Sequence, residues 1–275
     1  MAAAPSTELW LGLAAKPENL ALVRQALSGF ADGMSIPEGP LADLKQIATE
    51  ACMNAVVHAY PGRDDGRIDV SAVAKAGEVE LRVRDWGIGF HPRPASKDGS
   101  LRLGLPLIAS VVDSFGIESP DGGGTALVAR VRTNGAVEEA TVEMPAAPKE
   151  AEILIDAGAS AKPVIARVIA MAATRAGFSL DRMSDGVLVG DAIAAARPDD
   201  FADGRVGIEI KECGPNLCLQ VGPFQSGGAT RLLDQMELPG LGVSVSKLAD
   251  SVDVVESDDG EFLAIEIASG TAATI

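Results

Sequence analysis

Aromatic side chains make up only 4% of this 275-residue chain, which also has just two histidines and three cysteines. With so few aromatic residues, the core has to be built from Ala, Val, Leu and Ile. Two histidines cannot supply a zinc cluster with its usual ligand spacing. The three cysteines form no disulfide framework, and Cys52, inside an apolar run, is expected to be a small buried side chain.

Long apolar runs and a basic excess are missing too. No window approaches 18 uninterrupted apolar residues, and the N-terminal segment lacks the basic and apolar regions of a signal peptide. The formal net charge of -16 at pH 7 disfavours nucleic acid and anionic membranes as partners, although a nucleotide can still be held locally. We therefore expect a soluble, cytoplasmic, globular protein with no direct nucleic-acid or membrane partner.

The two halves of the chain resemble each other in the order of their segments. "ELWLGLAAKPENLALVRQAL" near the start is echoed by "AEILIDAGASAKPVIARVIAMAA", and each reads as a strand, an Ala-Lys-Pro turn and an amphipathic helix. Later segments match in the same order, which favours duplication over a chance likeness of two Ala-rich sequences. We predict domains at residues 1–145 and 151–275, joined by a linker at 146–150.

The pattern of the first half predicts its helices and strands. Val79, Leu81 and Val83 alternate with charged residues, which is the period of a half-buried strand. After the first strand we expect helices over 17–32, 40–59 and 104–115, a hairpin over 67–85 and a strand over 124–133. The fold class is α+β, a mixed and mostly antiparallel sheet covered by helices on one face.

A polar stripe interrupts the apolar segment "EACMNAVVHAY". Glu50, Asn54 and His58 are spaced by four residues, so a helix places them on one face. A carboxylate and an amide on that face can accept a proton and bind a hard cation through oxygen. Taken alone, the stripe could equally be the solvated side of an amphipathic helix.

The hairpin ends in a second candidate, "DWGIGF". Asp85 offers a carboxylate at a strand end, and Gly87 and Gly89 let the backbone approach a flat ligand. An ordinary turn after a strand has much the same pattern.

Two further segments are rich in glycine. Lys97 and Arg102 precede Gly104 at the start of a predicted helix, where exposed amide groups and two cations suit an anion. "DGGGTAL", which contains Gly122–Thr125, leads into a strand and could simply be a hairpin turn. It is not a P-loop, because no Gly-Lys-Ser/Thr follows.

Taken in order, "E-x-x-x-N", "D-x-G-x-G", "G-L-P-L-I" and "G-G-G-T" resemble the GHKL (Bergerat-type) ATP-binding fold. "TEACMNAVVHAYPG" is very similar to the first motif of its small bacterial branch, the anti-sigma-factor serine kinases of the RsbW type. The resemblance covers residues 8–133 and extends only faintly to the second half. It implies a sandwich of helices over a sheet that holds ATP beneath a lid.

The resemblance also implies roles for individual residues. Asn54 would ligate the Mg²⁺ that bridges the phosphates, and Glu50 would act as general base. Asp85 would accept a hydrogen bond from the adenine amino group, with Gly87 and Gly89 making room for the ring. His58 is expected to be structural and not catalytic.

The remaining residues would hold the phosphates and the base. Residues 91–104 would form the lid, ending at Gly104, and either Lys97 or Arg102 would meet the γ-phosphate. The adenine pocket would be lined by Gly122, Gly124 and Thr125.

The second half lacks the corresponding groups. Asp191 aligns with Glu50, but Ala195 stands four residues later, and "NLCLQVGPFQ" has no Asp for adenine. This half is also more acidic, with a net charge of -10 against -6 for residues 1–150. We expect a degenerate GHKL copy that does not bind nucleotide.

These implications give one leading hypothesis and one alternative. The leading hypothesis is a Mg-ATP-dependent serine/threonine kinase that phosphorylates a STAS-domain anti-anti-sigma protein and sequesters a sigma factor. The alternative is a regulatory module that binds ATP without transferring phosphate. The chain would act as a homodimer or as an intramolecular pseudo-dimer. A histidine kinase is disfavoured because only 49 residues precede Glu50, and a gyrase-like or chaperone ATPase would need a transducer domain.

Overall fold

The computed structural model describes residues 8–75, 77–89, 112–133, 151–214, 216–235 and 248–269. By its internal contacts the chain divides into two compact units, one of residues 1–27 with 36–149 and one of residues 28–35 with 150–275. The predicted domain bounds at 1–145 and 151–275 stay a prediction, and the predicted linker lies outside the described residues. No described helix is long and apolar enough to span a membrane.

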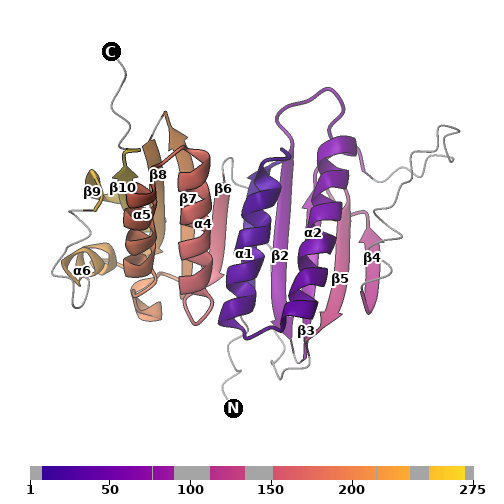
Figure 1. Ribbon diagram of the computed structural model, residues 1–275, viewed down its shortest axis with the longest axis horizontal. Helices are drawn as coiled ribbons and strands as arrows, with labels where there is room; N and C mark the ends of the chain where they lie inside the picture. The colour runs from indigo at the N-terminus through magenta and orange to yellow at the C-terminus, as the bar shows by residue number, and fades with distance from the viewer. Residues whose placement is uncertain are drawn as a thin grey trace, which may run out of the picture. The chain divides into compact units, whose positions relative to one another are not determined.

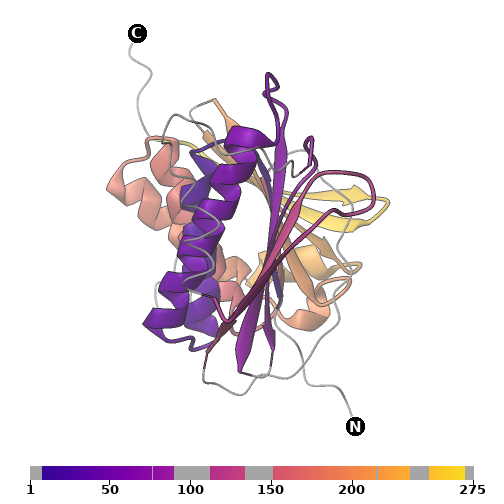
Figure 2. The same ribbon diagram turned by 90° about the vertical axis from the view of Figure 1, so that its right-hand side faces the viewer.

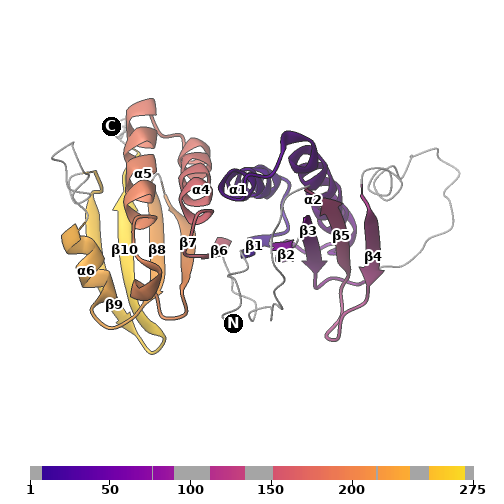
Figure 3. The same cartoon turned by 90° about the horizontal axis from the view of Figure 1, so that it is seen from below.

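In the first unit two long helices cover one face of an antiparallel sheet (Figures 1 and 3). The strands pair in the order β1-β2-β3-β5-β4, and every pair within this described sheet is antiparallel, which replaces the mixed sheet that we expected. The elements in chain order are β1 (Glu8–Ala14), α1 (Asn19–Gly33), α2 (Glu38–His58), β2 (Arg67–Lys75), β3 (Glu78–Asp85), β4 (Ser114–Glu118) and β5 (Ala126–Arg132).

The hairpin and the α2 helix follow from sequence pattern. β2 pairs with β3 as predicted, with Val70 opposite Val83, and β3 alternates between buried and half-buried residues. Helix α2 buries Leu44, Ile47 and other apolar residues, and it packs against β2, β3 and β5. Figure 2 shows from the side how the helix lies against the sheet. Burial of its apolar face holds it there.

One predicted element is wrong in part. The helix expected over residues 104–115 cannot reach its predicted end, because Ser114 and Phe115 belong to β4. Main-chain pairing with β5, where Phe115 lies opposite Ala129, outweighs the local helical pattern there. Residues 104–111 of that prediction lie outside the described part of the chain.

The second unit has its own antiparallel sheet, with strands in the order β6-β7-β8-β10-β9. Two helices again follow the first strand, and the pairing order matches that of the first unit strand for strand. The elements are β6 (Ala151–Asp156), α4 (Ala161–Arg175), α5 (Leu180–Ile193), the 3-10 turn η1 (Pro198–Asp200), β7 (Arg205–Cys213), β8 (Asn216–Phe224), α6 (Gly228–Gln235), β9 (Ser251–Ser257) and β10 (Gly260–Ile267).

The cysteines divide into a pair and a single thiol. Cys213 and Cys218 form a disulfide at the turn between β7 and β8, a pairing that we did not predict. It joins neighbouring strands that are already hydrogen-bonded, so it is a local crosslink and not a framework. Cys52 is buried on α2 as predicted, and burial raises the pKa of its thiol to about 12, which keeps it protonated.

Candidate nucleotide site

The site begins with a carboxylate at the end of β3. Asp85 is only 7% exposed, and its Oδ1 accepts hydrogen bonds from the main-chain N–H of Gly87 (2.9 Å) and of Thr125 (3.3 Å). The main-chain N–H of Asp85 donates in turn to the Thr125 carbonyl (2.9 Å). The "DWGIGF" and "DGGGTAL" segments, 40 residues apart, therefore meet at one carboxylate.

The environment of Asp85 changes its acidity. Burial raises the pKa of the carboxyl above its ordinary value, although hydrogen bonds from Gly87 and Thr125 and the nearby charge of Arg84 act in the opposite direction. A partly desolvated carboxylate of this kind can accept a hydrogen bond from a ligand amino group.

Two glycines in these segments are required by close approach of the backbone. A Cβ on Gly87 would lie 2.1 Å from the Ala59 carbonyl oxygen, and one on Gly124 would lie 1.9 Å from the Asp85 carbonyl oxygen. Gly124 also has a φ of +81°. We expected Gly87 to make room for a ligand ring, and the structure gives it an additional role, which is to let the end of α2 touch the Asp85 loop.

Gly89 and Gly122 have φ values of +81° and +91°, so each occupies the left-handed region that favours glycine. Both lie in turns flanking Asp85, one after β3 and the other before β5. These backbone conformations do not test whether Gly89 or Gly122 contacts a ligand.

Tyr60 joins three segments at this point, and sequence reasoning did not single it out. Its hydroxyl accepts a hydrogen bond from the Trp86 main-chain N–H (2.8 Å) and donates to the Arg67 carbonyl. Gly66 lies flat against the ring, since a Cβ there would be 2.4 Å from it. Tyr60 is the chain's one tyrosine and directly follows the polar stripe, which was the signal available in the sequence.

Both tryptophans of the chain lie beside the Arg67 guanidinium. The Arg67 guanidinium is 5.5 Å from the Trp10 ring centroid and 5.7 Å from that of Trp86. Arg84 is 4.5 Å from the Trp86 ring. These cation–π contacts hold the Trp86 side chain and so help to fix the residue that follows Asp85.

Helix α2 carries the polar stripe to the same place. Glu50 and Asn54 are half-buried on consecutive turns, and His58 is exposed at the last turn. The Ile88 main-chain N–H donates to the Ala59 carbonyl (3.0 Å), so the helix ends against the Asp85 loop. The structure therefore brings together Asp85, Gly87, Gly124 and Thr125 directly, with Glu50 and Asn54 on the helix that abuts them.

The predicted phosphate-binding residues Lys97, Arg102 and Gly104 lie outside the described residues. Among those described, no group of three or more His, Cys, Asp or Glu side chains could hold a metal ion by itself. Asn54 and Glu50 offer neutral and anionic oxygen on adjacent turns, which suits Mg²⁺ when the remaining ligands are phosphate and water. These two side chains fit a metal ion that is also bound by phosphate and water, and not one that is bound by protein side chains alone.

The positions predicted to correspond in the second unit have other partners. Asp191 on α5 forms an ion pair with Lys162 on α4 (3.3 Å). Helix α5 ends at Ile193, so Ala195 is not on its face at all. Phe224, at the end of β8, is fully buried, whereas Asp85 stands at the end of β3.

Part of this chain is similar to known proteins. A family model described as the histidine kinase-like ATPase domain matches residues 13–131. The serine-protein kinase RsbW of Listeria monocytogenes serotype 4a is 33% identical over 128 residues, which cover 42% of this chain and 82% of that protein. The anti-sigma F factor of Clostridium beijerinckii is 27% identical over 128 residues, covering 43% of this chain and 90% of that protein.

One solved structure also aligns with the chain. It contains the RsbU and RsbW domains of a Mycobacterium tuberculosis protein, at 12% identity and a TM-score of 0.31, and the alignment covers 97% of this chain and 87% of that one. That score is too low to support a shared fold. The relationship rests on the sequence matches, and because the chain covers 82% of a relative 33% identical to it, this protein belongs to the histidine kinase-like ATPase family that includes the serine-protein kinase RsbW.

Proposed function

We propose that this protein is an ATP-dependent serine/threonine kinase and anti-sigma factor. Its substrate would be a STAS-domain anti-anti-sigma protein, and it would sequester a sigma factor when that partner is absent. The observation that carries the proposal is the Asp85 carboxylate, held by Gly87 and Thr125 beside the end of the helix that bears Glu50 and Asn54. Relatives named serine-protein kinase RsbW and anti-sigma F factor support it.

Asp85 would select the base. Its carboxylate is oriented by two main-chain donors on Oδ1, and it would accept a hydrogen bond from the adenine amino group. Gly122, Gly124 and Thr125 would line the pocket. A charge-assisted hydrogen bond of this kind contributes about 1.5–3 kcal/mol, enough to decide whether adenine binds.

Asn54 and Glu50 would act at the phosphates. The Asn54 amide oxygen would hold Mg²⁺, which when bound neutralises phosphate charge during transfer. Glu50, one turn earlier, would accept the proton of the attacking serine or threonine hydroxyl. Lys97 or Arg102 would meet the γ-phosphate from the lid over residues 91–104, which ends at Gly104.

The second unit would be a degenerate copy of the first. Supporting this are the matching strand orders and the two helices that follow the first strand in each unit. With Phe224 where the first unit has Asp85, and Asp191 paired to Lys162, this copy would not bind nucleotide.

Calorimetric titration of Mg-ATP into the whole protein tests the nucleotide site. We expect one site per chain, weakened about 10- to 100-fold in Asp85→Ala because a charge-assisted hydrogen bond is lost. In Asn54→Ala, ATP should still bind, but the affinity should no longer depend on Mg²⁺. Two sites in the wild type would contradict the degenerate second copy, and none would contradict ATP binding.

Phosphate transfer needs a separate test, with Glu50→Ala assayed on a STAS-domain substrate. The kinase proposal expects ATP binding to be retained and transfer to fall by about 100-fold or more, as for loss of a general base. The alternative is that the protein is a regulatory module. In that case the wild type transfers no phosphate, and ATP regulates binding of the partner equally in Glu50→Ala and in the wild type.

A further inference from the structure

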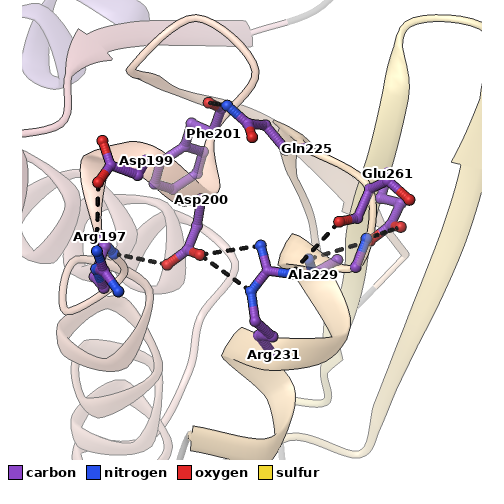
Figure 4. Close-up of polar contacts among 10 residues, drawn as sticks. Arg197, Asp199, Asp200, Phe201, Gln225, Ala229, Arg231 and Glu261 are labelled. Carbon is purple, nitrogen blue, oxygen red and sulfur yellow. Dashed lines mark hydrogen bonds and ion pairs between the residues drawn. The ribbon is translucent and has the colours of Figure 1, made fainter.

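In the second unit a carboxylate occupies the beginning of a helix. Glu261, at the start of β10, accepts hydrogen bonds from the main-chain N–H groups of Gly227 and of Ala229 (3.2 Å to Oε2), one through each oxygen (Figure 4). These two donors lie at the N-terminus of α6, where helical N–H groups have no partner within the helix. The helix dipole favours a negative charge at this end.

Glu261 stands where the first unit has Thr125. In the first unit the main-chain N–H of Asp85 donates to Thr125, and in the second unit Phe224 pairs with Glu261 at the same step of the ladder. Each residue follows a glycine, Gly124 or Gly260, at the start of the strand. A neutral side chain in the first unit is thus replaced by an anion in the second.

An aromatic pair replaces the other group of the site. Phe224 is fully buried and stacks on Phe201, with ring centroids 4.7 Å apart and an interplanar angle of 25°. The position that holds the Asp85 carboxylate in the first unit is therefore packed with apolar side chains, which offer adenine no hydrogen bond.

The cation on α6 is engaged as well. Arg231 donates from Nε and Nη2 to Oδ1 of Asp200 (3.4 and 3.3 Å), while the Asp200 carbonyl accepts from the Gln225 N–H (2.9 Å). A Cβ on Gly228 would lie 2.6 Å from that same carbonyl, so the helix start is pressed against Asp200. Helix α6 is held from two sides by carboxylate groups of its own chain.

We propose that Glu261 closes the second unit to nucleotides by occupying the amide groups at the start of α6 with its own carboxylate. The carboxylate does what a bound anion would do, and it holds α6 in place without a ligand. A phosphate group would have to displace Glu261 and approach a half of the chain that is ten charges negative. This inference rests on the proposed function only in naming nucleotides as what is excluded.

Hydrogen exchange of the full chain, read by mass spectrometry at residues 227–232, tests the proposal with inorganic phosphate as the probe. In the wild type we expect slow exchange that phosphate does not change. In Glu261→Ala, exchange there should be about tenfold faster, because two amides lose their acceptor, and phosphate should restore the protection. Glu261→Gln, which keeps one good acceptor, should be intermediate.

The matched control is Glu266→Gln on the same strand, where the carboxylate binds the Asn216 amide (2.6 Å) and makes no contact with α6 that the structure records.

Unchanged exchange in Glu261→Ala would overturn the proposal, as would phosphate protection in the wild type. Faster exchange that phosphate does not reverse would make Glu261 a helix cap only. Faster exchange throughout the second unit would make it a general structural residue. Because the readout is confined to α6, failure of ATP binding at Asp85 would leave this result interpretable.

Discussion

Asp69 on β2 is a buried carboxyl group behind the candidate site. It is 1% exposed, and the Arg67 Nε donates to its Oδ1 at 2.7 Å. Its Oδ2, the Arg67 Nη2 and the Trp10 Nε1 are buried without a hydrogen-bond partner in the structure. One ion pair in such surroundings does not compensate for the loss of water, and burial raises the pKa of Asp69 to about 6 despite Arg67.

This shift predicts a pH dependence of stability. Between about pH 4 and pH 6 the folded protein holds a proton on Asp69 that the unfolded chain has lost, so the free energy of unfolding falls as the pH rises through that window. The loss amounts to about 3 kcal/mol and is complete above pH 6. Asp69→Asn should remove this slope, as measured by denaturant unfolding from pH 4 to pH 7.

The exposed neighbour Asp64 offers a control for Asp69. Asp64→Asn should leave the pH profile of unfolding parallel to that of the wild type, since its side chain stays in water. If the Asp69→Asn and wild-type profiles are also parallel, the buried carboxyl does not titrate in this window and the prediction is wrong.

At the scale of elements, the position of α2 relative to the Asp85 loop depends on a few polar contacts. The Tyr60 hydroxyl bonds to Trp86 N–H and to the start of β2, and Ala59 accepts from Ile88. These contacts set the end of α2, and with it the polar stripe, against the loop that presents Asp85.

Tyr60→Phe should therefore affect both stability and nucleotide affinity. The Trp86 N–H loses its acceptor while partly buried, which costs about 1–2 kcal/mol of unfolding free energy. We also expect ATP affinity to fall by about three- to tenfold, measured by calorimetry, because the loop that carries Asp85 becomes less ordered. Arg63→Ala, which removes an exposed guanidinium 6.0 Å from the same ring together with its exposed ion pair to Asp65, is the matched control. Equal ATP affinity in Tyr60→Phe and the wild type would contradict a positioning role.

For the whole molecule, the proposal that the second unit is a degenerate copy of the first has a consequence for assembly, because two copies in one chain would not need a second chain to form a pair. If the degenerate copy takes the place of a partner subunit, the protein should be a monomer at micromolar concentration, with and without Mg-ATP. Light scattering measures this directly. A tight dimer built through the first unit would rule out the intramolecular pseudo-dimer and favour a homodimer.

The sequence by itself determined most of the helices and strands of the first unit, and its family. Period-two alternation predicted the β2–β3 hairpin, helical periodicity predicted α2, and the order of four motifs identified the family. The first two signals are local, because each depends on residues within one or two turns of a helix or along one strand. Each of the four motifs is likewise a short segment, although their order extends over residues 50–125. The end of the predicted helix at 104–115 was wrong because pairing with β5, which lies further along the chain, decides the conformation there.

Only the tertiary structure decided which residues from different segments are in contact. The contact of Thr125 with Asp85 and the bridging by Tyr60 join groups far apart in the chain, and both depend on strand register and helix position. The same is true of Glu261, an unremarked acidic residue in the sequence, whose carboxylate meets α6 only because β10 pairs with β8. Such contacts follow from the packing of distant segments, and no local pattern encodes that packing.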